Sequence, residues 1–275
     1  MLLLNILIIL NNMNWKKIFN LRNKNNLVGW IGNDKDSYAN LCKVFATNPE
    51  EFKTFKQNKT YQKILEHTSL SDGLFFFKLC ESFINKTSPE IINDWKSNDS
   101  IGGASISSKM GFSPSTLRYI NVLRKLVEKF GDLSDKHIVE IGGGYGGQCH
   151  IIKSMFNINN YTIIDIKEAL ALTKCYLNNF YNDGITYYPA DKIMGNGFSI
   201  SANLVISNYA LSELEEPIID LYISKIVKNC QQGYFCFNPN AINGYQFSKK
   251  LSFNCNIEDD KPYQKWENKL ISFGK

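Results

Sequence analysis

Five of the chain's 18 glycines stand within six positions, 142–147, in the sequence HIVEIGGGYGGQ. Glycine weakens both helices and strands, so such a cluster normally has a local cause. The cluster directly follows the apolar segment 137–141 and opens a stretch with helical character, 147–156. A turn from strand to helix leaves unsatisfied backbone N–H groups and the positive helix end at the carboxyl edge of a sheet. The glycines therefore predict a site where a ligand lies against the backbone.

From residue 137 onward, apolar strand candidates alternate with helical stretches. The strand candidates are 137–141, 161–165, 185–189, 203–207 and 233–238, with a hairpin-like edge formed by 253–257 and 270–274. The helical stretches are 147–156, 167–182 and 217–229. Short, nearly all-apolar strands that alternate with helices are typical of a parallel sheet covered on both faces. The sequence thus predicts an α/β protein with a doubly wound, mostly parallel sheet of the Rossmann-like kind.

The residues before this alternating part have the pattern of helices separated by polar turns. Asn48 and Pro49 are typical of a helix start, and the helix is expected to run on to position 67. Ser71 is a candidate cap for a second helix, and Ser88 for a third. We therefore expect the N-terminal part of the chain to be helical.

A loop and a strong helix connect the two parts. Residues 97–113 are rich in glycine and serine and lack periodicity, which predicts a loop. Pro114 then opens an amphipathic helix that Gly131 is expected to end. We predict a helical N-terminal region, 1–112, that serves as a lid, and a cofactor-binding domain, 113–275.

Charge and cysteine content limit the classes of protein to consider. A formal net charge of +5 from scattered lysines does not mark a nucleic-acid surface. The seven cysteines include no Cys-x-x-Cys pair, which is typical of reduced thiols in the cytoplasm. The apolar segment 2–10 is shorter than the roughly 20 residues that span a bilayer and lacks the basic leader of a signal peptide. We expect a cytoplasmic protein with no membrane span and no nucleic-acid partner.

The glycines fit two cofactor motifs. Gly142, Gly144 and Gly147 have the spacing of the dinucleotide fingerprint, in which a pyrophosphate rests on the helix end. Glu140, with Gly142, Gly144 and Gly146, has instead the spacing of the first motif of S-adenosylmethionine-dependent methyltransferases. Glu140 favours the second reading, because a carboxylate is unfavourable beside a pyrophosphate. It suits the positively charged methionine end of S-adenosylmethionine.

Two aspartates follow the next strands. Asp165 ends the second strand candidate, where a carboxylate accepts hydrogen bonds from both ribose hydroxyls of an adenosine cofactor. Asp191 lies just past the third, within reach of an adenine amino group; a helix cap or turn is its structural alternative. We expect both to bind the cofactor, S-adenosylmethionine.

The segments VEIGGGYGGQC, YTIIDIKEALALTKCYL and SNYALSEL together resemble a family of sugar O-methyltransferases found in surface-polysaccharide gene clusters. GFSPSTLRYINVLRKLVEKFGDL and, more weakly, EDDKPYQKWENKLISFG extend the resemblance. It covers roughly residues 100–240 and implies a class I methyltransferase fold. It also implies a sugar or glycan as the methyl acceptor.

The acceptor site is expected at the carboxyl end of the fourth strand. Asn208 and Tyr209 follow that strand, and Glu213 is the candidate general base that removes the hydroxyl proton. Arg118 and Tyr119, in the helix before the glycines, are candidates for holding the cofactor carboxylate or a sugar hydroxyl. The three histidines, His67, His137 and His150, have no metal-ligand spacing, so no metal site is predicted.

Two other readings stay open at this point. One is an NAD(P)-dependent oxidoreductase that uses the first glycine spacing, and the other is a non-catalytic binding subunit with a methyltransferase-like fold. A nucleic-acid methyltransferase is disfavoured, because amino-methylating enzymes carry Asn/Asp-Pro-Pro-aromatic after the fourth strand, where this chain has Ser207-Asn208-Tyr209-Ala210.

Overall fold

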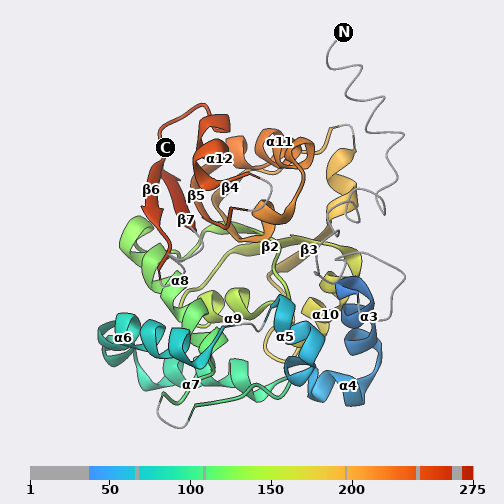
Figure 1. The fold of residues 1–275 in the computed structure, drawn as a ribbon, viewed down its shortest axis with the longest axis vertical. Coiled ribbons are helices and arrows are strands. Elements are labelled where there is room, and N and C mark those ends of the chain that lie inside the picture. Colours follow the sequence, from blue (N-terminus) through green and yellow to red (C-terminus); the bar gives the residue numbers. More distant parts are fainter. Residues whose placement is uncertain are drawn as a thin grey trace.

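The computed structural model of the chain describes residues 37–65, 68–107, 110–195, 197–239, 242–261 and 268–274. The apolar segment 2–10 and His67 lie outside these residues. The described residues form one seven-stranded sheet in the order β3-β2-β1-β4-β5-β7-β6 (Figure 1). The strands are β1 (His137–Ile141), β2 (Asn160–Asp165), β3 (Ile185–Pro189), β4 (Ala202–Asn208), β5 (Cys230–Phe237), β6 (Asn256–Asp259) and β7 (Lys269–Gly274).

The first five strands pair in parallel, whereas β7 is antiparallel to both β5 and β6. All seven lie within three residues of the predicted positions. The sheet reverses its order between β1 and β4, so ligands are expected at the carboxyl ends of these strands. The predicted α/β class and the doubly wound, mostly parallel sheet are confirmed.

Helices cover both faces of the sheet, and each face has its own buried core. On one face lie α8 (Pro114–Phe130), α9 (Gly147–Lys153) and α10 (Lys167–Leu177). On the other face lie α11 (Glu216–Lys225) and α12 (Gly244–Lys250). Because both faces are covered, the strands are apolar on both sides: Ile138 faces the first core and Val139 the second.

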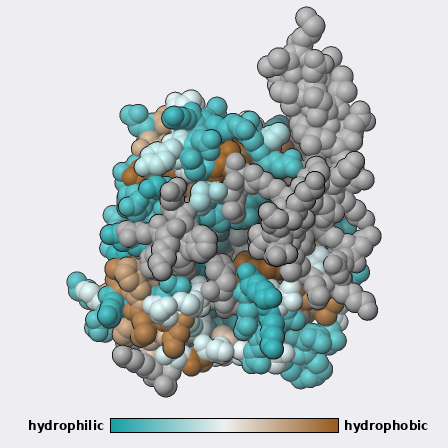
Figure 2. Space-filling view, viewed as in Figure 1, coloured by the Kyte–Doolittle hydropathy of each residue, from teal (hydrophilic) through white to brown (hydrophobic). Residues whose placement is uncertain are grey.

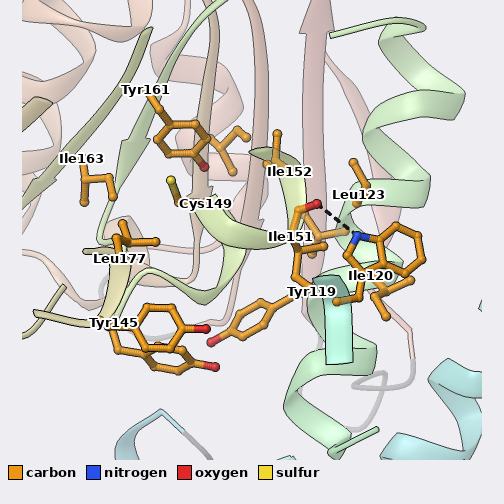
Figure 3. Close-up of a cluster of buried hydrophobic side chains, with 14 of the residues drawn as sticks. Tyr119, Ile120, Leu123, Tyr145, Cys149, Ile151, Ile152, Tyr161, Ile163 and Leu177 are labelled. Carbon is orange, nitrogen blue, oxygen red and sulfur yellow. Dashed lines mark hydrogen bonds between the residues drawn. The ribbon is translucent and has the colours of Figure 1, made fainter. Parts of the chain in front are cut away.

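The N-terminal helices form a further layer, which packs on α8–α10 and not on the sheet (Figure 1). They are α3 (Tyr38–Thr47), α4 (Pro49–Lys53), the 3₁₀ helix η1 (Phe55–Gln57), α5 (Lys59–Ile64), α6 (Leu70–Lys86) and α7 (Pro89–Ser100). The indole of Trp95 in this layer is fully buried and donates a 3.3 Å hydrogen bond to the carbonyl of Ile151 in α9. Figure 3 shows Ile151 with this bond as a dashed line. One buried core therefore extends across position 112, while the division into two functional units stays a prediction.

Four predicted helix ends are confirmed: the starts at Asn48, Ser88 and Pro114 and the end at Gly131. The side chains of Asn48, Ser88 and Ser113 accept hydrogen bonds from the first turns of α4, α7 and α8. Gly131 ends α8 with φ of 70°, a left-handed conformation that glycine adopts without strain. Ser71 was the wrong cap for α6: Ser69 caps it, because Asp72 bonds back to the Ser69 backbone and closes a capping box.

Several predicted lengths were wrong. The helix expected from Pro49 to 67 is three short helices, because the chain turns at Thr54 and the Asn58 side chain caps a new helix at Thr60 and Tyr61. Residues 97–100 belong to α7 and not to a loop. The helices predicted as 147–156, 167–182 and 217–229 end earlier, at Lys153, Leu177 and Lys225, the last being followed by the 3₁₀ helix η4 (Val227–Asn229).

Apolar side chains gather on the surface over α6, where Leu70 is 59% and Leu79 39% exposed (Figure 2). Scattered exposed apolar residues are normal on soluble proteins. Within the described part of the chain, no helix is both long enough and apolar enough to cross a membrane.

Candidate functional site

The glycine loop, residues 142–146, joins β1 to α9 at the carboxyl edge of the sheet. Left-handed backbone occurs at Gly142, Gly144 and Gly146, with φ of 78°, 58° and 97°. These are the three positions of the Glu140 motif. Gly147 is not left-handed, and a Cβ there would stand 2.6 Å from the ring of Tyr119, so it is small for packing. The backbone thus follows the spacing 142, 144, 146.

Asp165 fastens this loop to the end of β2. One carboxylate oxygen accepts a 3.2 Å hydrogen bond from the Gly144 backbone, and the other a 2.8 Å bond from Ile166. Burial raises the pKa of Asp165 to about 6, and the two backbone hydrogen bonds oppose that rise. Asp165 is therefore mostly ionised at neutral pH. Its charge also helps to raise the pKa values of Tyr38 and Cys42 in α3, after burial as the main cause.

Glu140 lies beneath the glycine loop and is only 2% exposed. Its carboxyl accepts a 2.9 Å hydrogen bond from the hydroxyl of Tyr161, and a Cβ on Gly143 would stand 3.7 Å from it. Burial raises the pKa of Glu140 to about 8; the charge of Asp165 adds to the rise and the Tyr161 hydrogen bond opposes it. The group is therefore mostly neutral at pH 7, and a nearby cation would favour its ionised form.

A cavity of about 20 Å³ lies at the carboxyl ends of β4 and β5. This volume holds about one water or hydroxyl group. The lining residues come from α6, α8, β4, β5 and the segment after β6: Phe76, Arg118, Tyr119, Asn121, Val122, Asn208, Tyr209, Tyr234, Cys236 and Asp260. The structure thus brings together four residues that the sequence singled out, two from α8 and two from the end of β4.

This β4–β5 cavity adjoins the glycine loop. A Cβ on Gly142 would stand 2.1 Å from the Cβ of Ala210, which directly follows Tyr209 in the chain. The ring of Tyr119 lines the cavity and also contacts the start of α9 at Gly147. A ligand on the glycine loop and a group in the cavity would therefore be close neighbours.

Other predicted residues lie elsewhere. Glu213 belongs to the 3₁₀ helix η3 (Ala210–Glu213), accepts a 2.8 Å hydrogen bond from Asn238, and is not among the residues that line the cavity. Asp191 is exposed at the start of the 3₁₀ helix η2 (Ala190–Met194). In the described ranges, no three His, Cys, Asp or Glu side chains could jointly hold a metal ion.

His150 is buried and hydrogen-bonded to neighbouring segments. It is 2% exposed, and its ring nitrogens form hydrogen bonds with Ser97, the Asp94 carbonyl and the Tyr181 hydroxyl. Burial lowers its pKa to about 4, so the ring is neutral at physiological pH. His150 thus joins α9 to α7.

Sequence reasoning missed the cavity residues that come from distant segments. Phe76, Tyr234 and Asp260 approach the site from α6, β5 and the segment after β6. Asp260 was included only in the weak C-terminal part of the family resemblance. No local pattern in the sequence marks these three positions.

No protein-family model matches the chain, and no curated protein matches it. Solved structures do resemble it. They include an S-adenosylmethionine-dependent methyltransferase from Mesorhizobium loti, with 14% identity, 55% of this chain and 96% of that chain covered, and a TM-score of 0.44. The pyocyanin biosynthetic protein PhzM has 11% identity, coverage of 78% and 71%, and a TM-score of 0.46.

A Haemonchus contortus N-methyltransferase in complex with phosphomonomethylethanolamine and S-adenosylhomocysteine has 11% identity, coverage of 55% and 51%, and a TM-score of 0.43. At these identities and TM-scores the likenesses say nothing about substrate. The function of this site must be argued from its own residues.

Proposed function

We propose that the chain is an S-adenosylmethionine-dependent O-methyltransferase that acts on a hydroxyl of a sugar, either a nucleotide sugar or a surface glycan. The observation that carries this proposal is the neighbourhood of two features. A left-handed glycine loop lies over one buried carboxyl group and is tied to a second, and it adjoins a cavity of the size of one hydroxyl that Asn208, Tyr209 and Asp260 help to line.

The residues around the glycine loop fit an adenosyl-sulfonium cofactor better than a dinucleotide. Glu140 lies beneath the loop, where an ammonium group would stabilise its ionised form and a pyrophosphate would not. Asp165, at the end of β2, would accept the ribose hydroxyls, and Asp191 past β3 the adenine amino group. The glycines at 142, 144 and 146 would let the methionine end approach the backbone.

The β4–β5 cavity has the polar groups that a hydroxyl-bearing acceptor needs. Within the described residues, the buried side-chain oxygen of Asn208 makes no hydrogen bond, whereas the hydroxyl of Tyr234 has the Cys236 thiol beside it. Buried polar atoms normally have partners, so a ligand group is expected beside the Asn208 oxygen. A sugar hydroxyl both donates and accepts. Arg118 and Tyr119 would hold other oxygens of the acceptor.

The bound cofactor would supply an electrophilic methyl group. The protein's part is to align the acceptor oxygen with it and to remove the hydroxyl proton. Asn208 would accept a hydrogen bond from the acceptor and orient it, while Tyr119, in contact with both the loop and the cavity, would fix the distance between the two reactants. Glu213, bonded to Asn238 at the end of β5, is the base that the sequence suggests.

The N-terminal layer would complete the site as a lid. Leu65 lies at the end of α5, and its side chain approaches the glycine loop. A Cβ on Gly144 would stand 3.1 Å from the Leu65 side chain. In α3, Tyr38 and Cys42 lie close enough to Asp165 for its charge to add to the rise that burial causes in their pKa values. The layer would exclude water from the cofactor.

Titration calorimetry with S-adenosylhomocysteine, S-adenosylmethionine, NAD and NADP tests the cofactor. We expect the two adenosyl-sulfur compounds alone to bind; binding of NAD or NADP alone would contradict the proposal. Transfer of labelled methyl groups to a panel of nucleotide sugars and glycans then tests the acceptor. A product methylated on nitrogen or carbon would contradict O-methylation.

A further inference from the structure

Tyr209 has an unusual backbone for its position. It directly follows β4 with φ of 67° and ψ of −18°, a left-handed conformation that is rare for a residue with a side chain. The conformation is held by three hydrogen bonds: the Tyr209 amide donates to the Cys236 carbonyl at 2.9 Å, and its carbonyl accepts from the Ser212 amide and hydroxyl. Such strain is typical of functional sites. Here it accompanies a phenol that lines the β4–β5 cavity.

The hydroxyl of Tyr209 donates a hydrogen bond to the carboxylate of Asp260. Asp260 is 5% exposed and also lines the cavity. Its other oxygen accepts a 3.1 Å hydrogen bond from the ammonium of Lys125, whose side chain is 13% exposed. A chain of hydrogen bonds therefore runs from the cavity through Tyr209 and Asp260 to α8.

This chain has the components of a proton relay. A phenol is a weak base by itself, but its oxygen can accept a proton while it passes its own to a hydrogen-bonded carboxylate. Asp260 can accept that proton, and the hydrogen bond from the Lys125 ammonium holds the Asp260 carboxylate in position. Glu213 lacks this access, because it bonds to Asn238 and does not line the cavity.

We propose that Tyr209 and Asp260 form the proton-accepting pair of the acceptor site, with Tyr209 as the catalytic residue and Asp260 as the positioning residue behind it. The inference rests on the proposed O-methyl transfer. As the acceptor oxygen bonds to the methyl carbon, the carbon–sulfur bond breaks and its electron pair stays on sulfur. The acceptor proton passes to the Tyr209 oxygen, and the phenolic proton of Tyr209 passes to Asp260.

The main test compares Tyr209→Phe, Asp260→Asn and wild type with a nucleotide sugar that wild type methylates. We expect kcat to fall about 100-fold or more in both variants, while the dissociation constant of S-adenosylhomocysteine changes less than twofold. Asp260→Asn keeps an oxygen that accepts from Tyr209 but is not a base, so the acidic limb of the kcat–pH profile should disappear. A merely structural role would leave that limb in place.

A matched control is Tyr245→Phe, which removes the hydroxyl of a tyrosine that is 51% exposed and outside the cavity lining; its kcat should equal that of wild type. If Asp260→Asn does not fold, Tyr209→Phe still tests the proposed pair, because this substitution removes only the phenolic oxygen and keeps the ring. Full turnover by Tyr209→Phe, with a large loss in Glu213→Gln, would overturn the pair and restore Glu213 as the base.

A second readout needs no acceptor. In protein labelled with carbon-13 at the tyrosine Cζ, the Tyr209 signal, assigned from Tyr209→Phe, should move in Asp260→Asn, because the Tyr209 hydroxyl donates to that carboxylate. A Tyr209 signal that ignores the Asp260 substitution would also overturn the pair. If wild type binds no S-adenosylhomocysteine but the signal behaves as expected, the proposed function fails while the coupled pair remains.

Discussion

The carboxyl ends of β1 and β2 and those of β4 and β5 lie at the same edge of one sheet, but they are built differently. We call the first the cofactor edge and the second the acceptor edge. At the cofactor edge, the contacts join residues close in sequence: Glu140 with Tyr161 and Gly144 with Asp165, each 21 positions apart. At the acceptor edge, Asp260 contacts Tyr209 and Lys125, which are 51 and 135 positions away.

The two edges also differ in how their polar groups are satisfied. Asp165 and Glu140 have hydrogen-bond partners within the described chain, and burial raises the pKa of each. At the acceptor edge, the side-chain oxygen of Asn208 has none among the described residues. A preformed cofactor edge suits a cofactor that many enzymes share. An acceptor edge with an unmet hydrogen bond suits a specific acceptor that supplies the missing partner.

The largest effect on ligand binding is expected at the cofactor edge. Asp165→Asn would replace a charged acceptor of the ribose hydroxyls by a neutral one, and hydrogen bonds to charged groups contribute about 1.5–3 kcal/mol each. We expect the dissociation constant of S-adenosylhomocysteine to rise about 100-fold in titration calorimetry. The control is Asp183→Asn, at an exposed aspartate. An unchanged constant in Asp165→Asn would remove the ribose role.

Glu140 should give the protein a distinctive pH dependence. Between about pH 7 and 8 the unfolded chain has lost the Glu140 proton, whereas the folded chain keeps it because its pKa is raised to about 8. The folded state then binds more protons, so the free energy of unfolding should fall as pH rises, by up to roughly 1.4 kcal/mol per pH unit. Below pH 7 the buried His150, with its pKa lowered to about 4, has the opposite effect on stability. Denaturant unfolding at several pH values measures this.

Glu140→Gln should flatten that dependence between pH 7 and 8, while Glu81→Gln, at an exposed glutamate, should leave it unchanged. A saturating ligand with an ammonium group should also reduce the slope in wild type, since it favours the ionised carboxylate. Equal slopes in wild type and Glu140→Gln would show that Glu140 is ionised without a ligand.

A third prediction separates the effect of backbone conformation on stability from the effect of a new side chain on ligand binding. Gly144→Ala and Gly111→Ala both place a side chain at positive φ, 58° and 71°, which costs about 1–2 kcal/mol. Only Gly144 has a close neighbour, Leu65. Both variants should lose similar stability in urea, but only Gly144→Ala should weaken binding of S-adenosylhomocysteine, by about tenfold. Equal binding by the two variants would mean that the ligand does not approach Gly144.

The smallest effect is expected at the acceptor edge. Asn208→Ala would remove one hydrogen bond to the acceptor, which contributes about 1 kcal/mol. We expect kcat/KM for the acceptor to fall about fivefold while cofactor affinity stays the same. Asn254→Ala, at an exposed asparagine, is the control. Loss of cofactor affinity in Asn208→Ala would show that Asn208 also contributes to cofactor binding, so that the two edges form one site.

The contrast between the edges also explains what could be predicted from the sequence. The strands, the glycine loop and Asp165 were predictable because each depends on a short segment with a strong local pattern. Arg118, Tyr119, Asn208 and Tyr209 line one cavity at the carboxyl ends of β4 and β5, and their binding of an acceptor stays a prediction. These are effects of strand order, which the alternating pattern largely determines.

Asp260 could not be predicted in the same way. It reaches the cavity only because β7 returns antiparallel beside β5 and β6 pairs with β7. The burial of Glu140 against Tyr161 was also not predicted, since it depends on the register of β1 with β2. The cap of α6 was misassigned because Ser69 and Ser71 both precede the apolar run, and only Asp72 decides between them.

A cofactor held on the glycine loop would have its methyl-donating end close to the β4–β5 cavity. A crystal structure of the protein with S-adenosylhomocysteine tests this placement most directly. We expect the ribose on Asp165, the amino group near Glu140, and the sulfur facing the cavity lined by Asn208 and Tyr209. A ligand bound with its sulfur turned away from that cavity, or bound at another place, would contradict the account.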